Sequence, residues 1–259
     1  MKILFIGDIV GKPGREAVKK LVPFLKQEEG VDFVIANAEN ASGGSGITSK
    51  VSAEIFSSGV DVITSGDHIW KKSEIFALIN QEERILRPLN FPAGAPGRGA
   101  AVFSSRKGVK VGVINVNGRV FMDALECPFK AALKAAQELA KETKIIIVDI
   151  HAEATSEKIA LGRYLDGKVS AVLGTHTHIQ TADEKILPGG CAYITDAGMT
   201  GPYDSVIGRR VEDVLTRFLS SIPVKFEVAD SDIQLHGALL EIDEATGKAV
   251  SIARVQKKL

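Results

Sequence analysis

Residues 169–178 read VSAVLGTHTH and join a short apolar run to a pair of histidines. The run Val169–Leu173 lacks the regular polar–apolar alternation of a half-exposed strand, which is typical of a β-strand covered on both faces. His176 and His178 follow it almost directly. Ligands of α/β proteins bind at the carboxyl ends of such strands. The segment therefore predicts an α/β fold with a functional site at the end of a buried strand.

The same arrangement recurs along the chain. Further apolar runs that end in polar residues lie at Lys2–Ile6, Phe33–Ala36, Val60–Thr64, Val111–Val116 and Ile145–Ile150. Helical spacing is present at Pro13–Lys26, Ser52–Phe56 and Phe129–Ala140. The C-terminal third instead predicts consecutive strands at Val224–Val228, Leu235–Ile242 and Ala249–Val255. This order favours a pair of mixed sheets with helices outside. Since no linker or repeat interrupts it, we expect a single domain over residues 1–259.

Composition excludes several classes of function. The chain has 259 residues, and its 32 Lys and Arg balance its 32 Asp and Glu. The zero net charge argues against strong binding to duplex nucleic acid or to an anionic membrane surface. Cys127 and Cys191 suggest neither a disulfide framework nor a thiolate metal site. No apolar run approaches the roughly 20 residues of a membrane span, and the N-terminus is typical of a strand. We therefore expect a cytoplasmic protein.

Metal-capable side chains follow five of the predicted strands. They are Asp8, Glu39, Asp67, His151, His176 and His178. One aspartate after a strand is ordinary, because Asp and Asn often form turns there. Six such residues are hard to assign to turns, since the carboxyl ends of strands meet at one edge of a sheet. We therefore expect these side chains to form one site.

The ligand types indicate the chemistry. Carboxylate oxygens and imidazole nitrogens without thiolates suit manganese, iron, zinc or nickel. Six ligands exceed the needs of one catalytic ion, and they suit two ions about 3.5–4 Å apart that share a carboxylate and a hydroxide. Such a pair favours hydrolysis of phosphate esters. His176 and His178 can face two ions only if the backbone leaves the strand geometry, and we expect Gly174 to permit this.

The polar motifs together resemble a known family. The motifs are Gly7-Asp8, Asn37–Asn40, Gly66–His68, Asp149–Glu153 and Gly174–His178. They are similar to those of the calcineurin-like metallophosphoesterases. Asn117–Met122 and Thr195–Gly201 further resemble the bacterial YmdB-like branch, and the resemblance extends from Met1 to about Val255. It implies a four-layer sandwich of two mixed β-sheets flanked by helices, a binuclear metal centre, phosphodiesterase activity on cyclic nucleotides, and a homo-oligomer.

The resemblance also implies a role for each site residue. The first metal ion would be held by Asp8, Glu39, Asn40 and His178. The second would be held by Glu39, Asp67, His151 and His176, with Glu39 as the bridge. His68 would be the catalytic residue that donates a proton to the leaving oxygen or stabilises the transition state beside it. We expect two divalent or trivalent ions per chain, iron first, with manganese or zinc as alternatives.

Three positions depart from the superfamily pattern. Val10 stands where a histidine is usual, so Asn40 must supply the missing ligand. Asp67 stands where an asparagine is usual, which adds a negative charge to the metal site. Ile69 follows His68 where an acidic residue often orients the imidazole, so the orienting partner must come from elsewhere.

Contacts to a substrate are less well defined by the sequence. Arg119 is either a phosphate clamp or a partner in a surface ion pair. Ser42 and Gly43 belong to the Gly-rich segment 41–46, which either lets a phosphate approach the backbone amides or is an ordinary flexible loop. Trp70 is either a wall of the site or a core residue.

We expect the protein to hydrolyse a small phosphodiester such as a 2′,3′- or 3′,5′-cyclic nucleotide, with a hydroxide that bridges the two metals as nucleophile. A phosphomonoesterase such as a nucleotidase is the first alternative, because the metal centre does not distinguish one ester bond from two. A nucleotide-sensing regulatory protein with weak catalysis is the second. The complete ligand set favours an enzyme.

Overall fold

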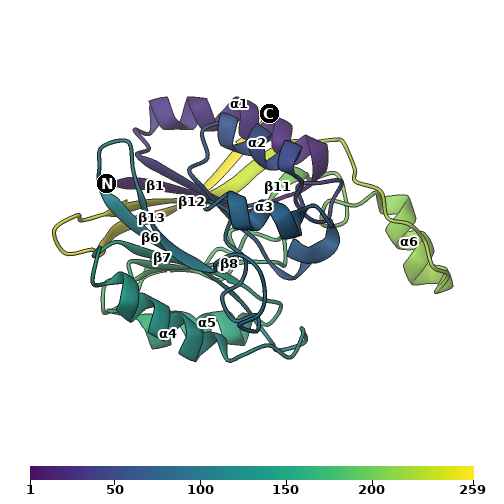
Figure 1. Ribbon diagram of the computed structural model, residues 1–259. Helices are drawn as coiled ribbons and strands as arrows, with labels where there is room; N and C mark the ends of the chain where they lie inside the picture. Colours follow the sequence, from purple (N-terminus) through teal and green to yellow (C-terminus); the bar gives the residue numbers. More distant parts are fainter.

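Two β-sheets packed face to face form the centre of the molecule, and helices cover the outer face of each sheet (Figure 1). The structure is a computed structural model that describes residues 1–259. On one side lie the helices α1 (Gly11–Glu28), α2 (Ser49–Ser57) and α3 (Ile75–Gln81). On the other side lie α4 (Pro128–Leu139) and α5 (Thr155–Leu165). The expected four-layer sandwich of two mixed sheets is confirmed.

The first sheet combines strands from both ends of the chain. It contains β1 (Lys2–Ile6), β2 (Asp8–Ile9), β3 (Phe33–Asn37), β4 (Val62–Thr64), β11 (Met199–Pro202), β12 (Ile233–Ile242) and β13 (Ala249–Lys258). β1, β3 and β4 are parallel neighbours, and β12 pairs antiparallel with β1. The carboxyl ends of the three parallel strands therefore lie together and deliver the segments that follow them to one edge.

The second sheet also contains neighbouring parallel strands whose carboxyl ends lie together. It contains β5 (Ala100–Ser104), β6 (Lys110–Asn117), β7 (Ile146–His151), β8 (Ala171–Thr175), β9 (Lys185–Ile186) and β10 (Ala192–Ile194). β6, β7, β8 and β10 are parallel, and the antiparallel strands β5 and β9 form the two edges. His151 is the last residue of β7 and Thr175 the last of β8. The histidines of the predicted site thus come from adjacent strand ends.

The packing of β1 explains why its apolar run is continuous. Ile3 and Phe5 lie in the core between the two sheets, whereas Leu4 and Ile6 pack against α1 and α2. Both faces of the strand are therefore removed from water, at a gain of roughly 25 cal/mol per Å² of apolar surface. No position on such a strand needs to be polar, so the alternation of a half-exposed strand is absent.

The C-terminal third differs from the expectation in one segment. β12 and β13 confirm two of the three expected strands. The strand expected at Val224–Val228 is wrong, because only Val228 makes an isolated bridge, to Arg209. Its backbone pairs with residues 209–210, through the Arg209–Val228 bridge and a hydrogen bond from the Arg210 nitrogen to the Glu227 carbonyl oxygen, and not with either sheet. Instead it follows α6 (Val211–Ser220), which stands away from the sandwich (Figure 1).

No helix of the structure combines the length and the apolar character needed to cross a membrane.

Candidate metal centre

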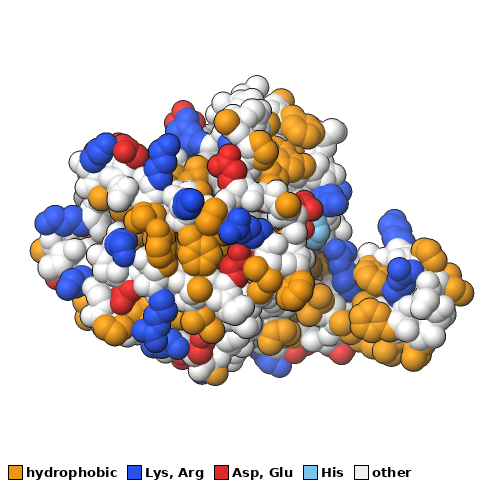
Figure 2. Space-filling model, turned by 90° about the horizontal axis from the view of Figure 1, so that it is seen from below, with side chains coloured by type: hydrophobic (Ala, Val, Ile, Leu, Met, Phe, Trp, Pro, Cys, Tyr) orange, Lys and Arg blue, Asp and Glu red, His pale blue; other side chains and the backbone are white.

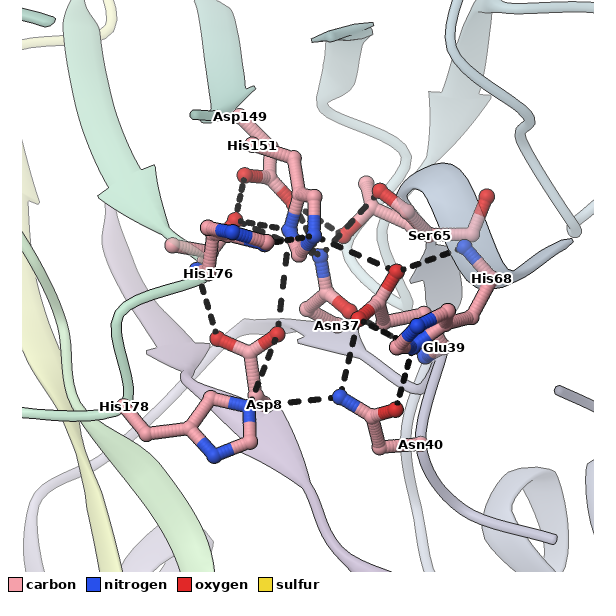
Figure 3. Close-up of polar contacts among 12 residues, drawn as sticks. Asp8, Asn37, Glu39, Asn40, Ser65, His68, Asp149, His151, His176 and His178 are labelled. Atoms are coloured by element: carbon pink, nitrogen blue, oxygen red, sulfur yellow. Dashed lines mark hydrogen bonds and ion pairs between the residues drawn. The ribbon is translucent and has the colours of Figure 1, made fainter. Parts of the chain in front are cut away.

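Four side chains from four separate segments converge where the parallel strands end, and Figure 3 labels three of them, Glu39, His151 and His176. Glu39 follows β3, Asp67 begins the short 3-10 helix 67–71, His151 ends β7, and His176 follows β8. One ligand atom of each lies within 4.8 Å of the ligand atoms of the others. Nε2 of His151 is 3.2 Å from Oε2 of Glu39 and 3.3 Å from Oδ1 of Asp67. The structure thus brings together the four residues expected at the second metal position.

The residues expected at the first metal position adjoin this group. Oδ1 of Asp8, in β2, is 4.0 Å from Nε2 of His178. Nδ2 of Asn40 is 3.2 Å from the same nitrogen and donates a hydrogen bond to Oε1 of Glu39 at 2.8 Å. Asp8, His178 and the amide nitrogen of Asn40 therefore lie together below Glu39 (Figure 3), whereas Oδ1 of Asn40, the atom that could bind a cation, is turned toward His68.

The Glu39 carboxylate lies between the two groups of donors. Its Oε2 contacts His151, and its Oε1 contacts Asn40 and lies 3.2 Å from Nδ1 of His68. The carboxylate is buried, so both oxygens are held by protein groups. This is the position that a carboxylate shared by two ions requires.

Several features show that these donors fit a cation. Oδ1 of Asp8 and Oδ1 of Asp67 are buried and accept no hydrogen bond. A buried carboxylate oxygen without a partner is costly to desolvate, and a coordinated cation would remove this cost. A Cβ atom at Gly66 would clash with Glu39 and with the ring of His151. Glycine at this position therefore keeps the centre open.

The charged groups of the centre shift one another's pKa values strongly. Burial alone would raise the pKa of Glu39, but the charge of His151 and hydrogen bonds from His151 and His68 hold it well below its usual range. Burial would lower the pKa of His151, yet the neighbouring carboxylates of Glu39, Asp67 and Asp8 raise it well above 6.5. The three carboxylates thus concentrate negative charge at one buried place.

A relay of hydrogen bonds orients His151 from behind. Its Nδ1 lies 2.9 Å from Oγ1 of Thr175, whose hydroxyl donates to Oδ1 of Asp149 at 2.8 Å. Thr64 and Asn37 donate to the other oxygen of Asp149 at 2.6 and 3.0 Å, and burial raises the pKa of this carboxyl to about 6. With Nδ1 engaged by Thr175, Nε2 of His151 is left to face the donors.

The loop that carries the histidine pair has an unusual backbone. His176 and His178 adopt left-handed conformations, with φ of 99° and 66°. The expectation that Gly174 permits this turn is wrong, because Gly174 lies in β8 with no left-handed φ. Gly174 is required for a different reason: a Cβ atom there would overlap the carbonyl oxygen of Thr195. Left-handed non-glycine residues cost of order 1–3 kcal/mol each, so the surroundings must hold the loop.

Asp196 supplies much of that support. Its Oδ2 accepts hydrogen bonds from the backbone nitrogen and the hydroxyl of Thr177, at 3.1 and 2.7 Å. Nζ of Lys158, in α5, donates to the same oxygen at 2.7 Å. The role of Lys158 was not expected from the sequence, because a lysine within a helix is ordinarily exposed, and Asp196 was known only as part of the motif Thr195–Gly201.

His68 lies at the mouth of the centre and is partly exposed. Its Nδ1 is 2.9 Å from Oδ1 of Asn40. A hydrogen bond with Glu39 is the main cause that raises the pKa of His68. Ile69, which follows, is buried. Asn40 and Glu39 therefore orient the imidazole in place of the acidic neighbour that the chain lacks.

A cavity of about 390 Å³ opens beside the centre and is lined by both expected and unexpected residues. Glu39, Asn40, His68, His176 and His178 line one side. The cavity is also lined by Glu153 and Arg209, for which the sequence had predicted no role. Oε2 of Glu153 lies 3.1 Å from Nε2 of His176, opposite the nitrogen that faces the metal position. Glu153 belongs to a motif quoted above, but nothing in its local spacing distinguished it from a helix-start residue.

The expected substrate contacts do not line this cavity. The Arg119 side chain is exposed, and its backbone nitrogen donates to the Glu157 carboxylate. Gly43 lines a neighbouring cavity, and Ser42 lines neither. Trp70 is half-buried, stacks on Phe76 with 5.4 Å between ring centroids and packs against the core, so it is not a wall of this cavity.

The sandwich and its carboxylate–imidazole centre are of the metallophosphoesterase kind. More particularly, the chain belongs to the family described as YmdB-like protein, which residues 4–255 match. A 2′,3′-cyclic-nucleotide 2′-phosphodiesterase of Bacillus subtilis is 50% identical over 255 residues, which cover 98% of this chain and 96% of that protein. A putative phosphatase/phosphodiesterase of Mycoplasma genitalium is 36% identical over 99% of this chain and 92% of its own length.

Solved structures agree over the whole chain. A hypothetical protein from Thermus thermophilus superposes with a TM-score of 0.91 at 41% identity, covering 100% of this chain and 99% of that one. A novel phosphatase from Mycoplasma pneumoniae superposes with a TM-score of 0.90 at 36% identity, covering 100% and 93%. The resemblance to the YmdB-like branch that the motifs indicated is confirmed.

Proposed function

We propose that this chain is a metal-dependent phosphodiesterase that hydrolyses nucleoside 2′,3′-cyclic phosphates, with 3′,5′-cyclic nucleotides as further candidate substrates. Its family, and relatives named as phosphodiesterases or phosphatases, identify it as a phosphoric diester hydrolase. The observation that carries the proposal is the pair of adjoining donor groups that share the Glu39 carboxylate. The name of the Bacillus subtilis relative supports the 2′,3′-cyclic substrate.

Two metal ions per chain are part of the proposal. One would be held by Asp8, Glu39, Asn40 and His178, and the other by Glu39, Asp67, His151 and His176. Iron is proposed first, and manganese and zinc suit the same oxygen and nitrogen donors. When bound, such ions supply Lewis acidity toward phosphoryl oxygens and lower the pKa of coordinated water.

The chain's own residues orient the reacting groups. Thr175 directs Nε2 of His151 toward the donors, and Glu153 engages the outer nitrogen of His176. His68 is proposed to donate a proton to the leaving oxygen. Its Nδ1 faces Asn40 at 2.9 Å, which leaves Nε2 as the nitrogen available to a substrate in the cavity.

Two further expectations belong to this proposal: a single domain and a homo-oligomer. The helix α6 presents Leu215 and Leu219 to solvent and the segment after it presents Ile222, with exposed fractions of 48%, 86% and 61%. A second copy of the chain packed on this row would remove that apolar surface from water. Light scattering after gel filtration measures the mass that tests the oligomer.

The proposed activity is tested by metal removal and restoration. Chelator-treated protein should lose hydrolysis of 2′,3′-cyclic nucleotides and regain it with manganese or iron, with two ions bound per chain. The variant His151→Ala removes one of the proposed metal ligands. Its matched control is His236→Gln, which changes a histidine outside the centre. Nucleoside monophosphates are assayed in parallel. Turnover of monoesters alone would make the protein a phosphomonoesterase, and nucleotide binding without turnover would make it a sensing protein.

A further inference from the structure

The cavity beside the metal centre has a second wall that the proposed chemistry does not use. This wall consists of Arg209 and the apolar side chains of Val206, Ile207, Val214, Phe218 and Phe226. They come from α6 and from the segments on either side of it. Figure 2 shows histidine at the edge of the main body, facing the protruding arm, whose surface is largely hydrophobic. The wall and the metal donors therefore face one another across one space.

The guanidinium of Arg209 has no anionic partner. Nη2 donates to the carbonyl oxygen of Gly44, and Nη1 donates to that of Phe226 at 3.4 Å. Arg209 takes part in no ion pair, and burial lowers its pKa without any opposing carboxylate. A Cβ atom at Gly44 would clash with this guanidinium, so glycine makes room for it. A partly buried guanidinium held by backbone carbonyls alone retains free donors for an anion, and phosphate oxygens suit its planar geometry.

Two aromatic side chains of the wall are exposed to water, which is energetically unfavourable. Phe218 is 75% exposed and Phe226 is 36% exposed, although both line the cavity. Val214, one helical turn before Phe218, faces the same space. Aromatic side chains beside a phosphate-binding group are the usual platform for a nucleobase, because every base presents an apolar π-face. The cavity volume of about 390 Å³ falls within the range of small-molecule sites.

Resting on the proposed function, we propose that this wall is the nucleobase subsite of the enzyme. Phe218 and Phe226 contact the base of a nucleoside cyclic phosphate, and Arg209 binds an oxygen of its phosphate on the side away from the metal donors. The substrate is then recognised as a nucleoside and not merely as a strained cyclic phosphate.

The test compares a substrate with a base and one without. Adenosine 2′,3′-cyclic phosphate and ribose 2′,3′-cyclic phosphate are hydrolysed by the metal-loaded wild type and by variants. The wild type should prefer the adenosine compound in kcat/KM by about 10-fold or more, and Phe218→Ala and Phe226→Ala should each reduce this preference by about 10-fold through KM. Phe218→Tyr should retain it. Arg209→Gln should lower kcat/KM for both substrates by a similar factor of about 10-fold or more.

Matched controls use the same residue types elsewhere. Phe24→Ala removes a phenylalanine of α1 that is 51% exposed, and Arg217→Gln removes an arginine of α6 that does not line the cavity. Neither should change the preference. Equilibrium binding of adenosine 3′-phosphate supplies a readout without turnover, and Phe218→Ala should weaken it about 10-fold.

The outcomes separate this inference from the proposed function. If the wild type hydrolyses both cyclic phosphates equally well, the phosphodiesterase stands and the base subsite is overturned. The subsite is also overturned if Phe218→Ala and Phe226→Ala leave the preference intact. If neither cyclic phosphate is hydrolysed although both metal ions are bound, the proposed function itself fails.

Discussion

The ammonium nitrogen of Lys158 lies 2.7 Å from Oδ2 of Asp196, and neither side chain is exposed to solvent. Asp196 also accepts two hydrogen bonds from Thr177, so this ion pair connects α5 to the loop that presents His176 and His178. Both histidines have left-handed backbones, which the loop would not keep without outside support. The pair therefore couples the stability of the fold to the geometry of the candidate metal centre.

Replacing Lys158 by methionine keeps most of the length of the side chain and removes its charge. We expect Lys158→Met to lower the free energy of unfolding by about 3–5 kcal/mol, because Asp196 remains buried without its cation. Urea unfolding measures this change. Lys134→Met, at an exposed position of α4, should change stability by less than about 0.5 kcal/mol. The double variant with Asp196→Asn should recover part of the loss, and full stability of Lys158→Met would contradict the coupling.

Removing the hydroxyl of Thr175 breaks the relay behind His151. Thr175→Val should lower metal affinity by about 10- to 100-fold, because Nδ1 of His151 loses the partner that fixes the ring. The metal content after equilibrium dialysis against a chelator of known affinity measures this effect. Thr216→Val, on the exposed surface of α6, is the control. Equal metal affinity in the wild type and Thr175→Val would show that the relay does not orient His151.

Asp67 stands where the superfamily pattern has asparagine, and its Oδ1 has no hydrogen-bond partner. Asp67→Asn removes one negative charge 3.3 Å from Nε2 of His151, so it should weaken binding of the second metal ion by about 10-fold or more. Isothermal titration with manganese resolves the two ions. Asp123→Asn, which removes an exposed carboxylate, is the control. Unchanged affinity would mean that Asp67 takes no part in metal binding.

His68→Ala should keep both metal ions and lower turnover, because His68 is proposed to act on the leaving group. For nucleotide substrates, whose leaving alkoxide needs a proton, the expected loss in kcat is roughly 10²–10⁴-fold. For bis(p-nitrophenyl) phosphate, whose leaving group needs little protonation, the loss should be smaller. Equal losses on both substrates would exclude proton donation. Loss of metal from the variant would make His68 a ligand instead.

We expect His236 to make the stability of the fold depend on pH. The side chain is buried beside Tyr203, with 4.2 Å between ring centroids, and burial lowers the pKa of His236 from 6.5 to about 4. Between these pH values the unfolded chain binds a proton that the folded chain does not. Stability should therefore fall as the pH decreases from 6.5 to 4, by up to about 1.4 kcal/mol per pH unit from this group.

The variant His236→Phe keeps an aromatic ring and should lose this contribution. The difference in the free energy of urea unfolding between variant and wild type, followed from pH 4.5 to pH 7, isolates it from the other titrating groups. If the free energy of unfolding changes with pH in the same way in both proteins, His236 takes up its proton in the folded state.

The class of fold and the donors that directly follow strands were predictable from the amino-acid sequence, whereas Asn40 was assigned only through the family resemblance. The reason is local: Asp8, Glu39, Asp67, His151 and His176 each follow an apolar run within a few residues. Strands buried on both faces show themselves as continuous apolar runs, and the ends of parallel strands coincide in space. Knowing where each strand ends was therefore enough to expect these side chains at one place: the structure brings four of them together, and Asp8 accepts a hydrogen bond from the backbone nitrogen of His176 beside them.

The support of the centre and the wall that faces it across the cavity depend on contacts that form only in the folded chain. Lys158 and Asp196 are 38 residues apart, and Arg209 and Gly44 are 165 apart, so no local pattern links either pair. The segment Val224–Val228 has the composition of a strand, but its only bridge joins Val228 to Arg209, outside both sheets. Gly174 is needed for a neighbouring carbonyl oxygen and not for its own backbone angle. Contacts of this kind depend on which surfaces meet after the sheets have packed, and that is a property of the whole chain.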